Sequence, residues 1–302
     1  MNSQSIVLVT GAATGIGRLS ARSLALAGHT VYASMRDLRD RNAANARELN
    51  AYATEHKVDL RPIELDVQSQ TSANEAIETI YNDQGSLDVV MHNAGHLVIG
   101  PAEAFTPEEI VRAFDVNLLG AQRVNRAALP RFRAQQHGLL LWIGSTTTRG
   151  GHPPFMGPYA AAKAALDSLA VDYAYEVARF GIETTIVVPG AFTKGTAHFP
   201  NAGKPADQMT ATAYESRYQG VLDSVGAKLS TLMPENADPQ AVADEVARIV
   251  NLPRGQRPFR SIVDFLGDGF AEVSEVADRV RINFAHRVGI ADLLKPTLVP
   301  RP

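Results

Sequence analysis

Three residues near the middle of the chain have types and spacing that could carry out proton transfer. Tyr159 and Lys163 stand four positions apart in an alanine-rich run that continues through Arg179 and predicts a helix. Residues four apart share one helix face, so the phenol and the ammonium would lie side by side. A phenol has a reference pKa of about 10, and a neighbouring ammonium favours the phenolate. Such a tyrosine can pass a proton to or from a substrate oxygen.

A serine hydroxyl is predicted to face the same place. The apolar run 139–143 predicts a buried strand, and Ser145 follows it after Gly144. A hydroxyl at the end of this strand, opposite the start of the helix, could bind the same substrate oxygen. Tyr-x-x-x-Lys is a weak signal taken alone, because helices contain many Tyr and Lys residues. Its weight depends on what else the chain carries.

The elements that must position these residues alternate along the chain. The predicted strands are 6–9, 30–34, 60–65, 87–91, 139–143, 182–188 and 261–265. Predicted helices are 18–27, 40–56, 69–82, 107–119, 122–135, 159–179, 208–229, 239–252 and 270–285. This alternation predicts a Rossmann-type α/β fold, a doubly wound parallel sheet of about seven strands with helices on both faces. We expect one domain over 1–302 with a core of about 5–265, a loop or lid at 193–235 and a C-terminal helical extension at 266–302.

A glycine-rich turn follows the first predicted strand. Gly11, Gly15 and Gly17 precede a predicted helix, with Thr14 and Ile16 between them. Glycine allows backbone to approach a ligand closely, and a helix N-terminus attracts phosphate. The spacing Gly-x-x-x-Gly-x-Gly differs from the Gly-x-Gly-x-x-Gly fingerprint. The turn predicts a dinucleotide site, and the alternative is a turn used only for packing.

The second predicted strand ends where a dinucleotide-binding protein reads the adenosine ribose. Ser34 stands where an acidic residue would favour NAD(H), and Arg36 follows two positions later. A hydroxyl and a guanidinium suit a 2′-phosphate. The sequence therefore favours NADP(H), with NAD(H) possible. The alternative is that Arg36 is a solvated charge beside Asp37.

Composition excludes several classes of function. The formal net charge is −3, so nothing suggests a nucleic-acid partner. The chain has no cysteine, and its eight histidines show no zinc-like spacing, so no metal site is predicted. No apolar run reaches the ~18 residues of a membrane helix, and the polar start 1–5 does not resemble a signal peptide. We expect a cytoplasmic protein with no membrane partner.

With these residues in hand, the chain resembles the short-chain dehydrogenase/reductase family in its single-domain branch, over about residues 5–195. The sequence motifs of this family occur in the family's order along the chain. They are Thr10-Gly11-x-x-x-Gly15-x-Gly17, Asp66-Val67, Asn93-Ala94-Gly95, Asn117, Ser145, Tyr159 with Lys163, and Pro189-Gly190 with Thr193. Each piece stands at or near the carboxyl end of a predicted strand, where open α/β sheets bind ligands.

The resemblance implies a role for each matching position. The catalytic set would be Asn117, Ser145, Tyr159 and Lys163. The cofactor contacts would come from Gly11, Thr14, Gly15, Ile16, Gly17, Ser34, Arg36, Asp66, Val67, Asn93, Ala94, Gly95, Tyr159, Lys163, Pro189, Gly190 and Thr193. The three glycines would hold the pyrophosphate, and Asp66 with the Val67 backbone would meet the adenine. Pro189, Gly190 and Thr193 would flank the nicotinamide amide.

Lys163 would also bind the nicotinamide ribose, and Asn117 would hold a water that links Lys163 to solvent. Other readings stay open for three of these side chains. Asp66 could be a helix-capping carboxylate, Asn93 a purely structural residue beside the cofactor, and Asn117 a packed polar residue. Two positions depart from the family pattern. His92 stands where many relatives have Asn, and Thr14 where NADP-preferring relatives often carry a basic residue.

The implied reaction is hydride transfer between a nicotinamide and a carbonyl or alcohol carbon. The expected substrate-pocket wall consists of 97–99, 152–156, Phe192, His198 and Phe199, which are mostly apolar and suggest a lipophilic ketone or secondary alcohol. The alternatives are a non-catalytic dinucleotide-binding sensor and a nucleotide-sugar epimerase or dehydratase. A homodimer or homotetramer is expected, with a small-residue helix face at Ala160, Ala161, Ala164 and Ala165.

Overall fold

Seven strands run parallel in one sheet of the computed structural model, which describes residues 4–192, 195–196 and 198–298. Their order across the sheet is β3-β2-β1-β4-β5-β6-β7. The strands are β1 (Ile6–Val9), β2 (Thr30–Met35), β3 (Leu60–Glu64), β4 (Val89–His92), β5 (Gly138–Ile143), β6 (Ile182–Pro189) and β7 (Arg260–Val263). The doubly wound parallel sheet expected from the sequence is confirmed.

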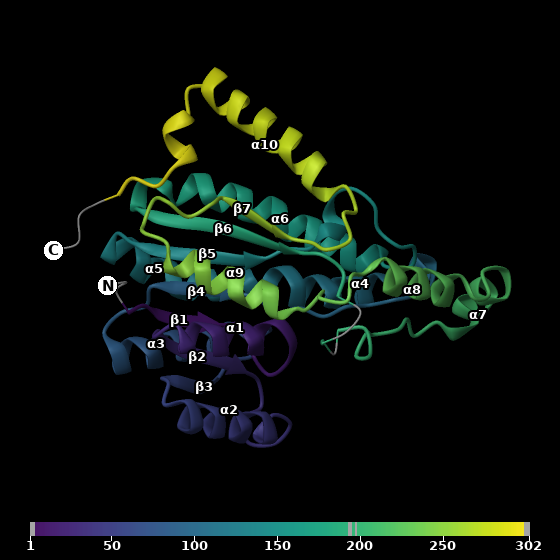
Figure 1. Ribbon diagram of the computed structural model, residues 1–302, viewed down its shortest axis with the longest axis horizontal. Helices are drawn as coiled ribbons and strands as arrows, with labels where there is room; N and C mark the ends of the chain where they lie inside the picture. Colours follow the sequence, from purple (N-terminus) through teal and green to yellow (C-terminus); the bar gives the residue numbers. More distant parts are fainter. Residues whose placement is uncertain (1–3, 193–194, 197, 299–302) are drawn as a thin grey trace.

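Helices cover both faces of this sheet (Figure 1). They are α1 (Gly15–Leu26), α2 (Ala43–His56), α3 (Gln70–Gln84), α4 (Pro107–Phe114), α5 (Gly120–Gln135), α6 (Gly157–Glu176), α7 (Gln208–Arg217), α8 (Val221–Leu232), α9 (Gln240–Asn251) and α10 (Phe270–Arg287). Short helical turns lie at η1 (Ala102–Ala104), η2 (Asp115–Leu119), η3 (Thr146–Thr148), η4 (Ala178–Phe180) and η5 (Ala291–Leu294). In Figure 1 α7 and α8 project at one side, and α10 rises away from the sheet above α6.

Alternate strand residues build two cores, one on each face of the sheet. On one face Leu8, Leu140 and Trp142 pack under α3, α5 and α6. On the other, Val9 and Leu141 pack under α1, α2 and α9. Successive side chains of a strand point to opposite faces, so a strand buried on both faces must be apolar throughout. This explains why the apolar runs of the sequence located the strands.

The chain reverses its winding direction between β1 and β4. After β3 it returns to the other side of β1, so the loops that follow β1 and β4 separate from each other. Ligands of open α/β sheets bind in the crevice at such a point. Thr10 holds the two strand ends together here, because its hydroxyl accepts from the backbone N–H of Asn93 (2.9 Å) and Ala94 (3.1 Å).

Several element boundaries differ from those predicted. β2 continues one residue further, to Met35, and residues 40–42 form a turn before α2. The stretch predicted as one helix over 208–229 is divided into α7 and α8, because Gly220 adopts a positive φ of 75° between them. A π-helical turn, η2, joins α4 to α5 where the sequence indicated only a break.

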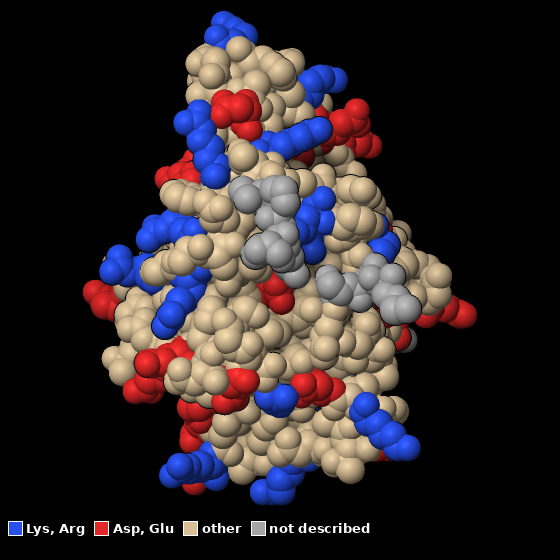
Figure 2. All heavy atoms as spheres, turned by 90° about the vertical axis from the view of Figure 1, so that its left-hand side faces the viewer, with Lys and Arg blue, Asp and Glu red and all other residues tan. Residues whose placement is uncertain are grey.

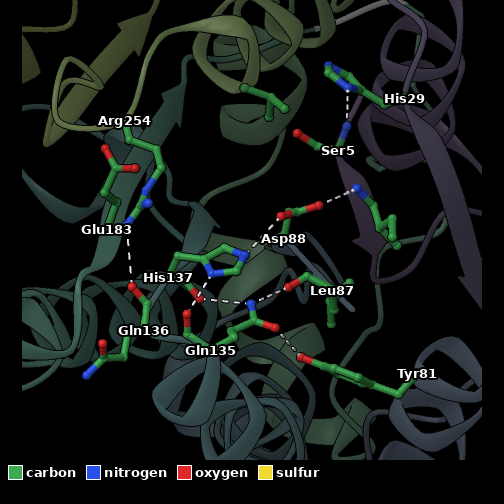
Figure 3. Close-up of polar contacts among 12 residues, drawn as sticks. Ser5, His29, Tyr81, Leu87, Asp88, Gln135, Gln136, His137, Glu183 and Arg254 are labelled. Carbon is green, nitrogen blue, oxygen red and sulfur yellow. Dashed lines mark hydrogen bonds and ion pairs between the residues drawn. The ribbon is translucent and has the colours of Figure 1, made fainter. Parts of the chain in front are cut away.

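The N-terminal ends of the strands are closed by a polar network (Figure 3). Asp88, just before β4, accepts from the backbone N–H of Ile6 (2.9 Å) and lies 3.3 Å from the imidazole of His137. Gln135 donates to the carbonyl oxygens of Leu87 (2.7 Å) and His137 (2.9 Å). The phenol of Tyr81 donates to the amide oxygen of Gln135 (2.9 Å). Backbone groups at this end are therefore bonded within the protein.

Acidic and basic side chains are interspersed on the face shown in Figure 2 and do not gather into one patch of a single sign. Within the described ranges, none of the helices combines the length and the apolar character needed to cross a bilayer. The charge distribution of this face gives no support to a polyanion-binding surface.

Candidate active site

A cleft of about 1020 Å³ runs along the C-terminal ends of the strands. It is lined at one end by the glycine turn after β1, and at the other by Ser145, Tyr159 and Lys163. Most of the residues expected to bind cofactor line it as well: Gly11, Thr14, Gly15, Ile16, Gly17, Arg36, Asp66, Val67, Asn93, Ala94, Gly95, Pro189 and Gly190. Residues from six separate loops thus meet in one continuous cavity.

The glycine turn can exist only because the residues at its closest contacts lack a side chain. Gly11 has a φ of 65°, and a Cβ there would lie 2.8 Å from the Cα of Ala94. A Cβ on Gly17 would lie 2.3 Å from the side-chain nitrogen of Asn93. That amide donates to the carbonyl oxygens of Thr10 (2.9 Å) and Gly11 (3.0 Å). Asn93 thus ties the glycine turn to the end of β4 and also lines the cleft.

The N-terminus of α1 opens into this cleft. Thr14 is its N-cap residue, is exposed, and makes no side-chain capping hydrogen bond. The first N–H groups of a helix have no partner within the helix and carry partial positive charge. This end of α1 can therefore hold a phosphate group.

Two arginines and an acidic residue line the cleft near the glycine turn, on the side of β2 and β3. Arg36, directly after β2, donates to the side-chain oxygen of Gln68 (3.4 Å). Arg41, in the turn before α2, also lines the cleft. Across the part of the chain that the structure describes, neither arginine forms a salt bridge, so Arg36 does not pair with Asp37. Their combined positive charge lowers the pKa of the nearby His96, after the larger effect of burial.

The residues beside these arginines also make structural contacts. Asp66 accepts from the backbone N–H of Gln68 (3.0 Å) in the turn before α3 and also lines the cleft, whereas the N-cap of α3 is Ser69. Val67 packs against α5, where a Cβ on Gly120 would lie 2.9 Å from it. Arg41 was not among the residues expected to bind the cofactor. It fell inside the helix predicted over 40–56, whereas in the structure it lies in the turn before α2.

Ser34 was expected to bind the cofactor together with Arg36, and the structure does not place it in the cleft. Its side chain is fully buried, and its hydroxyl finds no hydrogen-bond partner among the described residues. The physical reason is the length of β2. Because the strand continues to Met35, Ser34 lies within the sheet, and Met35 and Arg36 reach the cavity instead.

Ser145, Tyr159 and Lys163 converge at the other end. All three are buried in the wall of the cavity. Tyr159 and Lys163 lie in the first two turns of α6, where a spacing of four residues puts them on one face. The ammonium of Lys163 donates to the carbonyl oxygen of Ile143 at the end of β5 (3.0 Å). The hydroxyl of Ser145 lies 2.9 Å from that of Thr147.

The protonation behaviour of this end is governed by burial. Burial raises the pKa of Tyr159 to about 12, and its hydrogen bond with Ser145 acts in the opposite direction. Burial lowers the pKa of Lys163 to about 8. The sequence predicted a lowered pKa for Tyr159 because of the adjacent lysine. In the structure burial of the phenol raises the pKa instead, so Tyr159 is protonated at neutral pH.

Asn117 lies in the π-helical turn η2 and does not line the cavity directly. Its amide nitrogen donates to the carbonyl oxygens of His96 and Ala113, both at 2.9 Å, and its oxygen accepts from the N–H of His96 (3.1 Å). A Cβ on Gly95 would lie 2.9 Å from that oxygen and 3.6 Å from the ammonium of Lys163. Asn117 and Lys163 therefore flank the same small space behind Gly95. Single π-turns of this kind occur frequently at functional sites.

The loop after β6 forms the wall beside Tyr159. Gly190 donates to the carbonyl oxygen of Val263 (2.9 Å), and a Cβ on it would lie 2.1 Å from a carboxylate oxygen of Asp264. Glycine is required here because the two loops that follow β6 and β7 pass so closely. Thr193, expected to bind the nicotinamide amide, lies outside the described residues.

The expected substrate-pocket wall is only partly present in the cavity. The residues that line it are Leu97, Val98, Pro153, Met156, Phe192, His198 and Phe199. The rest of the expected wall, Ile99, His152, Pro154 and Phe155, does not line it. Phe155 has a φ of 66°, and its ring contacts that of Tyr218 edge-on at 5.8 Å. His198 contacts the ring of Tyr159 edge-on at 5.6 Å.

Part of the segment after β6 is attached across the mouth of the cavity. Gly203 pairs with Val98 in a parallel bridge, exchanging hydrogen bonds with Leu97 and Ile99 (both 2.8 Å). In α7, which buries none of its residues, Tyr214 donates to a carboxylate oxygen of Glu103 (2.8 Å). Gly203 and its neighbour Lys204 line the cavity, whereas no residue of α7 does.

The arrangement of the sheet and the cleft matches one protein family. The model of the short chain dehydrogenase family matches residues 5–205. The chain belongs to this family. The matched residues therefore include β1 to β6 and the glycine turn, whereas α7 to α10 and β7 lie beyond them.

Relatives of this short-chain dehydrogenase include a 3-ketodihydrosphingosine reductase from Bacteroides thetaiotaomicron, which is 32% identical over 190 residues. The match covers 63% of this chain and 65% of that reductase, slightly less than two thirds of its length. A solved short-chain dehydrogenase from Streptomyces avermitilis superposes with a TM-score of 0.71 at 24% identity and covers 96% of this chain and 98% of its own. A gluconate 5-dehydrogenase from Burkholderia cenocepacia, solved with NADP and tartrate, gives 0.67 at 22% identity, covering 90% and 96%. At these identities the two structures show a shared fold.

Within the described ranges, no three His, Asp or Glu side chains are grouped as metal ligands.

The small residues expected to share an outer face of α6 differ in their exposure. Ala161 and Ala164 are exposed, Ala165 is half-buried and Ala160 faces the interior. The predicted face is therefore narrower than the sequence suggested.

Proposed function

We propose that this short-chain dehydrogenase interconverts a ketone or aldehyde and an alcohol, with NADP(H) as cofactor. One observation carries the proposal: a single cavity joins the open N-terminus of α1 to Ser145, Tyr159 and Lys163. A phosphate-holding turn and a proton-transfer group in one cavity are what a nicotinamide-dependent reaction requires. The bound nicotinamide supplies or accepts the hydride, and the protein supplies orientation and electrostatics.

The side chains at the reacting end can serve the reductive direction at neutral pH. The phenol of Tyr159 is protonated there and can donate its proton to the carbonyl oxygen of the substrate, and its hydrogen bond with Ser145 opposes the rise in its pKa that burial causes. Ser145 donates a second hydrogen bond to that oxygen and stabilises its developing charge. Lys163 donates to the carbonyl oxygen of Ile143, and from there it would hold a hydroxyl of the nicotinamide ribose. It could then pass a proton to the Tyr159 phenolate and regain one from solvent through the space that it shares with Asn117 behind Gly95. In the oxidative direction its positive charge favours the phenolate.

The residues around the adenosine end fit a 2′-phosphate. Arg36 and Arg41 both line the cavity, and neither is neutralised by a salt bridge among the described residues. Charge-assisted hydrogen bonds from guanidinium groups are short and strong with phosphate oxygens. This supports NADP(H) over NAD(H), with Asp66 and Val67 beside the adenine.

The apolar part of the cavity supports a lipophilic substrate. Leu97, Met156, Phe192 and Phe199 surround the space in front of Tyr159. The relative at 32% identity is named for a ketone that it reduces. A panel of lipophilic, small charged and sugar carbonyls, each assayed with NADPH and NADH, tests the proposal. Oxidation of NADPH with lipophilic carbonyls supports it, and a preference for sugar or small charged substrates would defeat the substrate class.

Two alternatives from other classes make different predictions in the same assay. A dinucleotide-binding sensor would bind NADPH without any turnover, and an epimerase or dehydratase would return its cofactor unchanged. The convergence of Ser145, Tyr159 and Lys163 on one cavity favours an enzyme over a sensor, because a sensor needs none of the three. Net consumption of NADPH therefore decides among these functions.

The segment 193–235 would act as a lid. The few contacts that hold α7, among them the Tyr214–Glu103 hydrogen bond, support a segment that can open and close. Limited proteolysis with and without saturating NADPH tests the lid, because closure should protect this segment.

The chain would assemble into a homodimer or homotetramer. Light scattering during size-exclusion chromatography tests this assembly.

A further inference from the structure

The loop that carries Ser145 is anchored through Arg149, four residues further along. Thr148 donates through both its N–H (3.3 Å) and its hydroxyl (3.0 Å) to the carbonyl oxygen of Ser145. The N–H of Arg149 donates to the carbonyl oxygen of Thr146 (3.2 Å). Ser145 and Arg149 therefore belong to one rigid turn, and a shift of Arg149 would move Ser145 with it.

The guanidinium of Arg149 reaches α6 on the face that carries the proton-transfer groups. Its Nη2 donates to a carboxylate oxygen of Asp167 (2.7 Å). Asp167 is 5% exposed and follows Tyr159 and Lys163 at successive intervals of four residues. Tyr159, Lys163 and Asp167 therefore form one row along α6. The Arg149–Asp167 ion pair joins the loop of Ser145 to the same helix that holds Tyr159.

The beginning of α10 completes this anchor. The other nitrogen of the guanidinium, Nη1, donates to the hydroxyl of Ser274, which is 2% exposed. The ring of Phe270, fully buried, lies under the guanidinium at 5.8 Å. Figure 1 shows α10 beginning near the end of β7 and rising above α6, so its first turns are the part that reaches the loop.

The neighbouring residues of the loop are fixed to the same place. The N–H of Gly151 donates to the carbonyl oxygen of Asp268 (3.0 Å), and a Cβ on Gly150 would lie 2.9 Å from that oxygen. A second arginine, Arg260 of β7, shares Asp167 through both of its terminal nitrogens. A buried carboxylate held by two arginines has a strongly restricted position.

We propose that α10 is a positioning element of the active site, in which Ser274 and Phe270 hold Arg149 on Asp167 and thereby fix Ser145 opposite Tyr159. The proposal rests on the function proposed above. Arg149 is a positioning residue, because it contacts neither the cavity end of Tyr159 nor the reacting atoms. Its role follows from geometry: Ser145 must lie within hydrogen-bond distance of the same substrate oxygen as Tyr159, and its loop is anchored to α6 by this ion pair.

The test compares two contacts that hold the C-terminal segment. Arg149→Met and Ser274→Ala remove the Arg149–Ser274 hydrogen bond near Ser145. Arg179→Met removes the ion pair between Arg179 and Asp292 (2.8 Å) at the far end of the segment. We expect the first two variants to lose about tenfold to a hundredfold in kcat, because small misplacements of catalytic groups have effects of that size. NADPH affinity should be unchanged in them, Arg149→Lys should restore part of kcat, and Arg179→Met should retain it.

A double-variant cycle separates positioning from a general loss of structure. If Arg149 acts through Ser145, Arg149→Met has no further effect on kcat in a protein that already carries Ser145→Ala. Equal losses of kcat in both backgrounds, or retention of wild-type kcat in Arg149→Met and Ser274→Ala, would overturn the proposal.

A readout that needs no turnover distinguishes this proposal from the proposed function. Hydrogen–deuterium exchange of the amides in 145–156 should be faster in Arg149→Met and Ser274→Ala than in wild type, and unchanged in Arg179→Met. If the wild type consumes no NADPH with any carbonyl while this exchange pattern is found, the proposed function fails and the anchor stands. Unchanged exchange in all three variants overturns the anchor, whatever the activity.

Discussion

The two ends of the sheet differ in whether their polar groups are hydrogen-bonded within the protein or open to a cleft. At the N-terminal ends, Asp88, Gln135 and Tyr81 bond backbone and side chains into a closed network (Figure 3). At the C-terminal ends the same strands lead into glycine turns, the open N-terminus of α1 and a cleft of about 1020 Å³. Satisfied groups stabilise the fold, whereas groups left open at a crevice are available to a ligand.

A pair of carboxylates makes the contrast concrete. Asp88 and Asp66 each accept a backbone N–H close to a strand end, from Ile6 and Gln68 respectively. Asp88 lies before β4 at the closed end, and Asp66 lies after β3 in the wall of the cleft. The same chemical group should therefore serve stability at one end of the sheet and binding at the other.

The largest effect is expected from Tyr159→Phe at the open end. Removal of the phenolic proton should lower kcat by about 10²–10⁴-fold, which is the range for a general acid. Affinity for NADPH, measured by fluorescence titration, should be unchanged, because the glycine turn and α1 are untouched. A variant that turns over as fast as the parent would remove the basis of the proposed mechanism.

A pH effect on stability is expected from His92, which lies buried beside Trp142 at 4.5 Å. Burial lowers its pKa from 6.5 to about 4. The folded protein therefore keeps this imidazole neutral while the unfolded chain binds a proton below its own pKa of 6.5, so stability is lost as the pH falls from 6.5 towards 4. The resulting loss in the free energy of unfolding is about 3 kcal/mol, at about 1.4 kcal/mol for each pKa unit.

Urea unfolding at a series of pH values checks this effect. His92→Asn retains a polar side chain that does not titrate there. The variant should therefore lose less stability than wild type over the same pH interval, since other groups titrate equally in both. Identical losses in the two proteins would show that His92 does not contribute.

A smaller loss of stability is expected from Asp88→Ala at the closed end. The backbone N–H of Ile6 would lose its partner in a partly buried place, which lowers the free energy of unfolding by about 1–3 kcal/mol. The kcat of the folded variant should not change. Asp66→Ala is the matched control and should weaken NADPH binding more than it lowers stability. If Asp88→Ala weakened NADPH binding and Asp66→Ala mainly lowered stability, the contrast between the two ends would be wrong.

The smallest effect is expected from Arg41→Ala beside the adenosine end. We expect the KM for NADPH to rise about tenfold, equivalent to about 1.4 kcal/mol, while the KM for NADH stays the same. Arg47→Ala is the control, because Arg47 is exposed on α2 and does not line the cleft. An equal change for both nucleotides would show that Arg41 does not read the 2′-phosphate.

Most of the fold could be predicted because its signals are local. The apolar runs of β1 and β5 and the glycine turn between Gly11 and Gly17 each indicate their structure within a few residues. Ser34 was expected in the cleft because the strand was predicted to end at residue 34. Since β2 continues to Met35, the side chains of Met35 and Arg36 reach the cleft instead. Arg41 was missed because it depends on where α2 begins, and element boundaries are weakly encoded in local sequence.

The sequence by itself determined the parallel α/β sheet and the residue types that can hold phosphate and move a proton, because periodicity and spacing are properties of neighbouring residues. Only the tertiary structure decided that Arg149, Asp167 and Ser274 meet, since they come from a loop and two helices and are separated by up to 125 positions in the sequence. It also decided that burial, and not Lys163, dominates the pKa of Tyr159. Desolvation depends on everything packed around a group, which no stretch of sequence contains.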